Sequence, residues 1–150
     1  MIALIQRVSS ARVDVEDVGE TGSIGKGLCV FLCAVVGDGD DDADWLADKI
    51  ARLRVFSDDR GRFNHSLKDI GGDVLLVSQF TLAADASKGN RPSFIRAARP
   101  EEAVPLLQRF SGRLREEHGI TVEEGHFGAS MSVELANDGP VTLQLDTQSR

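Results

Sequence analysis

Two short segments hold the side chains that could most readily take part in chemistry. Ser78-Gln79-Phe80-Thr81-Leu82 ends an apolar run with two hydroxyls and a carboxamide. Such groups at a strand end could orient a small polar substrate together with backbone N–H groups. Asn137-Asp138-Gly139-Pro140-Val141-Thr142 contains a Gly-Pro bond between two strand-like runs. A cis bond would present two carbonyls in nearly one direction, but an ordinary strand end and an ordinary turn remain alternatives.

The usual machinery of hydrolysis is missing from the sequence. None of the three histidines stands in a metal-binding spacing, and there is no G-x-S-x-G elbow or glycine-rich phosphate loop. A Ser-His-Asp triad assembled from distant positions stays an open alternative. We therefore expect no metal and no cofactor.

The composition is that of one globular domain. The chain has 150 residues, of which 41% are apolar and 27% charged. Its longest apolar run, residues 28–36, is far shorter than the ~20 residues that span a bilayer. The N-terminus has no basic region before an apolar stretch, so a cytoplasmic protein without a membrane segment is expected. Cys29 and Cys33 are expected to be buried thiols without chemistry.

Charge is unevenly distributed along the chain. The net charge is −7, and the segment 38–48 holds six aspartates and no base. The segment 86–100 holds four bases and no acid, namely Lys88, Arg91, Arg96 and Arg99. Solvated faces of opposite sign are the simplest interpretation. An acidic protein can nevertheless bind a short RNA end through one local basic patch.

The hydrophobic pattern predicts a mixed α/β domain in which strands outnumber about two helices. Strands are expected within residues 1–15, 28–36, 74–80, 120–123, 130–135 and 141–145. Alternation then places Gln79 and Thr81 on one face and Ser78 and Phe80 on the other. The expected helices cover residues 43–55 and about four turns around residues 103–114. Residues 19–27, with four glycines, are expected to form a turn, and residues 137–140 the last connection.

These elements predict a single domain over residues 1–146 with a frayed polar tail at 147–150. Helices on one face of the sheet leave its other face to be covered by a partner chain or a second sheet.

The two candidate segments also make the chain resemble the bacterial D-aminoacyl-tRNA deacylases. Three further segments look like that family and occur in the expected order. They are Met1-Ile2-Ala3-Leu4-Ile5-Gln6-Arg7-Val8, Phe56-Ser57-Asp58 and Arg91-Pro92-Ser93-Phe94. The resemblance covers nearly the whole chain and ends shortly before the C-terminal tail.

The resemblance implies a homodimer that hydrolyses the ester between a D-amino acid, or glycine mischarged on tRNA-Ala, and the 3′-terminal adenosine of tRNA. Gly139-Pro140 would be cis, reach into the partner's pocket and exclude an L side chain. Ser78, Gln79, Phe80 and Thr81 would line that pocket as the catalytic segment. Within it Thr81 is the candidate nucleophile, but a threonine with no adjacent base is poorly activated, so a positioning role is favoured. Met131 would lie near the adenine. Lys88, Arg91, Arg96 and Arg99 are candidates for contact with tRNA.

Two other functions stay open. A paralogous editor that removes an L-amino acid would keep the scaffold and differ at the two motifs, and Phe80 with the Val141-Thr142 ending favours the D-specific branch. A non-catalytic dimeric binding module would use both motifs as plain structure.

Overall fold

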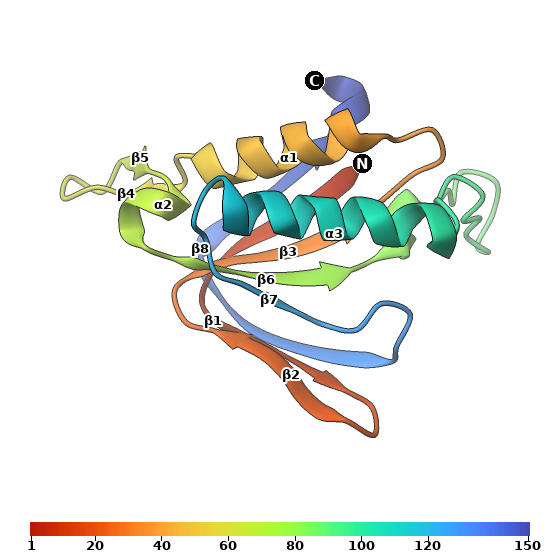
Figure 1. Ribbon diagram of the computed structural model, residues 1–150, viewed down its shortest axis with the longest axis horizontal. Helices are drawn as coiled ribbons and strands as arrows, with labels where there is room; N and C mark the ends of the chain where they lie inside the picture. Colours follow the sequence, from red (N-terminus) through yellow and green to blue (C-terminus); the bar gives the residue numbers. More distant parts are fainter.

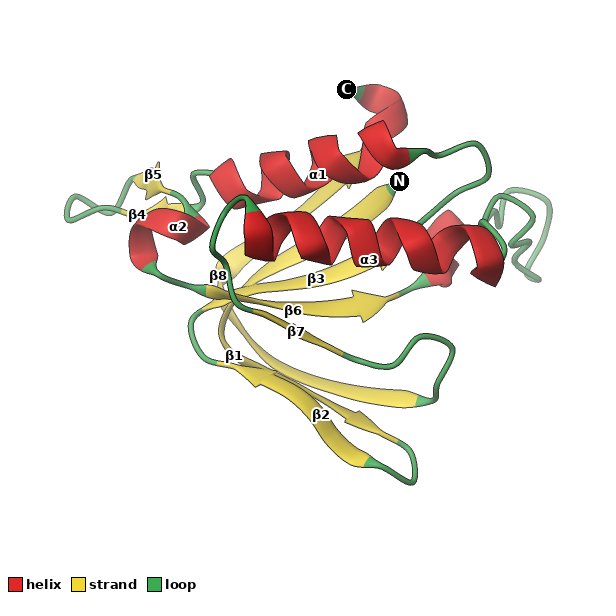
Figure 2. Cartoon of the chain, viewed as in Figure 1, coloured by secondary structure: helices red, strands yellow, loops and turns green.

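Six strands form a mixed and nearly closed sheet, with the two long helices on one side of it (Figures 1 and 2). The computed structural model describes residues 1–150. The strands of this sheet are β1 (Ile2–Val15), β2 (Gly19–Ile24), β3 (Gly27–Cys33), β6 (Asp73–Ser78), β7 (Val122–Glu124) and β8 (Met131–Asp146). The long helices are α1 (Asp40–Arg52) and α3 (Pro100–Glu116). The smaller elements are β4 (Phe56–Ser57), β5 (Phe63–His65), α2 (Leu67–Ile70) and the 3₁₀ turns η1 (Phe80–Ala83) and η2 (Thr147–Ser149).

The sheet has the order β2-β1-β3-β6-β7, and β8 pairs with β1 along its whole length. The β3–β6 and β6–β7 pairs are parallel, and the other pairs are antiparallel. The two ends of this order approach each other at Gly22, where an added Cβ would lie 3.0 Å from the Glu123 Cβ. Glycine therefore lets β2 come close to β7 and the sheet curl almost into a barrel.

The curled sheet buries apolar side chains on both of its faces. The larger cluster joins α1 and α3 to the outer face and includes Leu46, Ile50 and Phe110. A second cluster, with Val13 and Leu75, fills the inside of the curl. The other face, expected to need a partner or a second sheet, is thus covered largely by the chain's own strands. No helix is long and apolar enough to cross a membrane.

Both cysteines are buried free thiols, as the sequence predicted. Cys29 lies in the inner cluster, and burial raises the pKa of its thiol to about 12. A thiol in such surroundings is not a nucleophile at neutral pH.

The acidic segment 38–48 is not simply a solvated face. Arg113 donates two hydrogen bonds, of 2.7 and 2.9 Å, to the Asp48 carboxylate, and Arg109 pairs with Asp40 and Asp44. The Arg113 hydrogen bond holds the pKa of Asp48 well below its usual range. Five of the six aspartates in the segment are paired within the chain, namely 38, 40, 42, 44 and 48. Much of the acidic charge therefore stabilises the α1–α3 packing rather than facing a ligand.

Several element boundaries differ from the sequence prediction. Residues 19–24 of the expected turn form β2, because β1 offers an antiparallel partner. The first helix begins at Asp40, where three aspartates favour the first turn, and α3 begins at Pro100 rather than near residue 103. The tail is not frayed, because Thr147 is buried and its N–H donates to the Met1 carbonyl at 2.9 Å.

The expected connection at residues 137–140 is a bulge inside one continuous strand. Both halves of β8 pair with β1, and the register shifts between Gln6 and Val8, opposite this segment. Proline has no N–H to give to the ladder, so the pairing is interrupted at Pro140 and resumes at Thr142.

Candidate active site

The chain holds a cavity of about 630 Å³ where the C-terminal end of β6 meets the start of α3. Ser78, Gln79 and Phe80 form one wall. The segment before α3 forms another, and residues 127–133 close the third side. Arg99 is the one ionisable residue among the 18 that line it. The cavity therefore suits a largely apolar or aromatic ligand and brings no acid or base to it.

The strand end differs from the predicted alternation. β6 stops at Ser78, and the chain turns into η1 at Phe80. Ser78, Gln79 and Phe80 consequently all line the cavity instead of facing in opposite directions. The first hydrogen bond of the turn runs from the Leu82 N–H to the Gln79 carbonyl, at 3.2 Å. The N–H groups of Phe80 and Thr81 precede it and are not used by the turn.

Thr81 lies outside the residues that line the cavity, but its hydroxyl contacts one of them. The Gln79 carboxamide donates a hydrogen bond to the Thr81 Oγ1, so this predicted pair is brought together. No other side chain bonds to that hydroxyl, and a carboxamide cannot take up its proton. The geometry thus gives Thr81 an orienting contact and no activating base.

Aromatic rings and a thioether surround the remaining space. The Phe80 ring is 57% exposed and meets Phe94 edge to face, with ring centroids 5.2 Å apart. Met131 and Phe127 both line the cavity. Sequence reasoning missed Phe127, whose one signal is a large aromatic residue between Gly125 and Gly128 directly after a strand.

The four predicted basic residues are close to this cavity or on the segment that borders it. Arg99 lines the cavity and directly precedes α3. Lys88 and Arg91 lie in the loop between Asp85 and Ser93, which pair with each other as an isolated β-bridge. All four side chains are exposed, and none forms an ion pair within the chain. They are therefore available for a polyanion.

Gly139 and Pro140 are exposed at the tip of the β8 bulge, and the bond between them is cis. Arg7, whose role the sequence did not reveal, holds the bulge from beneath. Its Nε donates to the Asp138 carbonyl at 2.9 Å, and its NH1 donates to the Val55 carbonyl at 2.6 Å. The guanidinium is 5.5 Å from the centre of the Phe63 ring. Arg7 is thus buried and donates hydrogen bonds to two backbone carbonyls, so it fixes the backbone next to Gly139.

The two candidate segments do not meet within one chain. Ser78 is level with Leu32, whereas the bulge faces Arg7, which is level with Leu28 and Val74. Four residue positions along the strands correspond to roughly 13 Å. Three strand-to-strand steps, from β8 through β1 and β3 to β6, add to that separation. Gly139 and Pro140 do not line the Ser78–Phe80 cavity.

Comparisons with known proteins agree with the predicted resemblance. A family model described as D-Tyr-tRNA(Tyr) deacylase matches residues 4–146. A D-aminoacyl-tRNA deacylase of Ruegeria sp. (strain TM1040) is 53% identical over 150 residues, covering 100% of this chain and 95% of that protein. A solved structure described as a c-Myc DNA unwinding element binding protein has a TM-score of 0.90 at 38% identity, covering 97% of this chain and 98% of the other. A structure described as a probable eukaryotic D-amino acid tRNA deacylase has a TM-score of 0.82 at 17% identity, with coverages of 96% and 97%.

The family model and the similar relative place this nearly closed sheet, with its strand-end cavity, in a class of hydrolases that act on aminoacyl-tRNA. The chain belongs to the D-aminoacyl-tRNA deacylase family, because the family model and a closely similar relative both span almost all of it.

Proposed function

We infer that this protein is an editing hydrolase that cleaves the ester bond of D-aminoacyl-tRNA and releases the free D-amino acid and tRNA. Family membership carries this conclusion. The cavity beside Ser78, Gln79 and Phe80 supports it, because it is large enough for a nucleoside and is lined by aromatic and apolar groups. Glycyl-tRNA formed on tRNA-Ala is a second substrate under this proposal, and the cytoplasm, where tRNA is charged, is the proposed location.

The terminal adenosine occupies the cavity in this proposal, with its base near Met131 and its ester near Phe80 and Thr81. The N–H groups of Phe80 and Thr81 then stabilise the oxyanion that forms as water attacks the ester carbonyl. The adjacent ribose 2′-OH assists the attack, because the cavity supplies no acid or base of its own. Positioning and oxyanion stabilisation of this kind can lower a barrier by several kcal/mol.

A homodimer completes the site in this proposal. The Ser78–Phe80 cavity of one subunit lacks the Gly139-Pro140 bulge, which is separate from it within the chain and exposed. Gly139 and Pro140 of the partner subunit would close the cavity, engage the substrate's amino group through main-chain carbonyls and leave no room for an L side chain. Arg7 supports this role because it holds the bulge rigidly, and discrimination by exclusion needs a rigid wall.

Incubation of the purified protein with D-tyrosyl-tRNA and L-tyrosyl-tRNA tests the function. We expect rapid loss of the D ester and survival of the L ester, measured as the fraction of tRNA still acylated over time. Preferred loss of the L ester would instead support an L-specific editor. Survival of both esters would support a binding module, and equal loss of both would refute chiral selection.

Thr81→Ala is expected to retain substantial deacylation, because no base contacts the Thr81 hydroxyl. Single-turnover rates with D-tyrosyl-tRNA should fall by no more than about tenfold, which corresponds to the loss of one ordinary hydrogen bond. Thr81→Ser is the matched control and should resemble the unmodified protein. A loss of about 10⁴-fold or more in the alanine variant would instead identify Thr81 as the nucleophile.

A further inference from the structure

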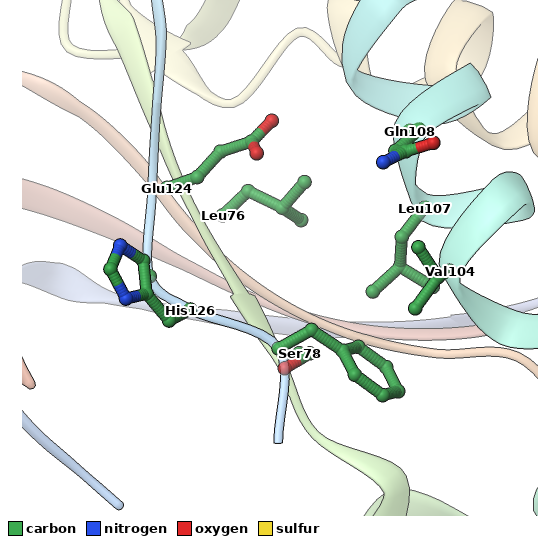
Figure 3. Close-up of a pocket in the computed structure, with 9 residues that line it drawn as sticks. Leu76, Ser78, Val104, Leu107, Gln108, Glu124 and His126 are labelled. Atoms are coloured by element: carbon green, nitrogen blue, oxygen red, sulfur yellow. The ribbon is translucent and has the colours of Figure 1, made fainter. Parts of the chain in front are cut away.

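A second, smaller hollow of about 260 Å³ adjoins the cavity along the same face of α3. The two spaces share Ser78, Leu107 and Phe127 in their walls, so they adjoin as a first and a second part of the same surface region. Figure 3 shows the second part, with Gln108 on α3 facing Leu76 and Glu124 across it. The activity proposed above assigns no role to this part.

The second hollow carries polar groups that the chain leaves unused. The Gln108 carboxamide makes no side-chain hydrogen bond within the protein, and the Ser111 hydroxyl donates to the Gln108 backbone carbonyl instead. Glu124 accepts from Arg115 at 3.1 Å through Oε1, while its Oε2 has no partner. One wall therefore offers an amide donor and acceptor, and the facing wall offers a free carboxylate oxygen.

We propose that this hollow binds the base of the nucleotide that precedes the terminal adenosine, which in tRNA is a cytidine. The inference rests on the proposed function, which places the adenine near Met131 in the larger cavity. Bases of single-stranded RNA can be splayed apart, so the next base can occupy a separate space that adjoins the one holding the adenine. The second hollow begins at Phe127, which belongs to both walls.

Cytosine matches the polar groups of this hollow better than uracil does. The N4 amino group of cytosine is a donor that a carboxylate accepts, which suits the free oxygen of Glu124. The Gln108 carboxamide can donate to the cytosine O2 or N3. Uracil has the acceptor O4 where cytosine has its N4 amino group. Two acceptors, O4 and the Glu124 carboxylate, would then face each other with no hydrogen between them. Single-stranded RNA is commonly read in this way, by hydrogen bonds to exposed base edges.

The test uses three stable analogues in which an amide replaces the ester of a D-alanyl group. The first carries 3′-amino-3′-deoxyadenosine alone, and the others add a 5′ cytidylyl or a 5′ uridylyl unit. Isothermal titration calorimetry measures their Kd values for the full chain. The gain is the factor by which a dinucleotide analogue binds more tightly than the adenosine analogue. We expect a gain of about tenfold for the cytidylyl analogue, at least three times the gain for the uridylyl analogue.

Gln108→Ala should remove most of the cytidylyl gain and leave the affinity for the adenosine analogue unchanged. Gln108 is exposed, so its truncation does not disturb the core. Glu116→Ala is an equal truncation at an exposed position of the same helix outside both pockets, and it should keep the gain. Any of three results would overturn this inference alone. The cytidylyl analogue could bind no more tightly than the adenosine analogue, the cytidylyl and uridylyl gains could be equal, or Gln108→Ala could keep the full gain. Failure of the adenosine analogue to bind would overturn the proposed function as well.

Discussion

Arg7→Met is expected to lower the free energy of unfolding by about 3 kcal/mol, because it removes a charged donor and leaves the buried Val55 carbonyl without its hydrogen bond. It should also lower the deacylation rate of D-tyrosyl-tRNA by about 100-fold, since the released Asp138 carbonyl no longer fixes the bulge. Urea unfolding measures the first effect. Single-turnover assays with D- and L-tyrosyl-tRNA measure the second, and we expect the D/L rate ratio to fall.

Two variants separate positioning from general damage. Arg7→Lys keeps the charge, but one ammonium lacks the planar fork that reaches both carbonyls, so stability should recover more than the D/L ratio. Arg12→Met removes an arginine from the same strand that is exposed and pairs with Glu134 at the surface, and it should change neither property appreciably. If Arg7→Met were destabilised while its D/L ratio stayed intact, Arg7 would be purely structural.

Elements set by local pattern were predictable from the sequence. The apolar run around Leu28 and the run around Leu75 are β3 and β6, and the spacing of Leu46 and Ile50 marks α1. The strand-end motif was also found, because polar groups that end a buried run stand out in any sequence. The basic residues from Lys88 to Arg99 stand out as a charge pattern, and the structure places Arg99 in the cavity wall and the other three on the segment that leads to it.

Features that depend on non-local pairing were not predictable. The glycines of β2 indicated a turn, but Gly22 pairs with β1 as part of a strand, and glycine is needed there because β7 approaches too closely for a side chain. Residues 137–140 were predicted to be a connection, since nothing local shows that both halves of β8 pair with one 14-residue strand. Arg7 belongs to a family-like segment, but nothing local indicated its structural role, because its partners lie 48 and 131 positions away along the chain.

Neutralising Lys88, Arg91 and Arg96 together is expected to weaken the binding of D-aminoacyl-tRNA by about 100-fold at low salt, since each is exposed and unpaired. The slope of log Kd against log salt should become shallower by about 2, as three phosphate contacts to a single strand predict. The triple glutamine variant leaves Arg99 in the cavity wall intact. Its affinity for the adenosine analogue should therefore be unchanged, which separates contact with the tRNA body from contact with the terminal nucleoside.

The matched control neutralises Lys49, Arg52 and Arg60, one lysine and two arginines that are equally exposed and equally without ion pairs. They lie at the end of α1 and on the β4–β5 hairpin, at the opposite end of the molecule from the segment before α3 (Figure 1). Both triple variants change the net charge from −7 to −10, so a general electrostatic effect would weaken both equally. A selective effect of the first triple would place the acceptor stem on the segment 86–99. An equal effect of both would mean that net charge, rather than this segment, governs tRNA binding.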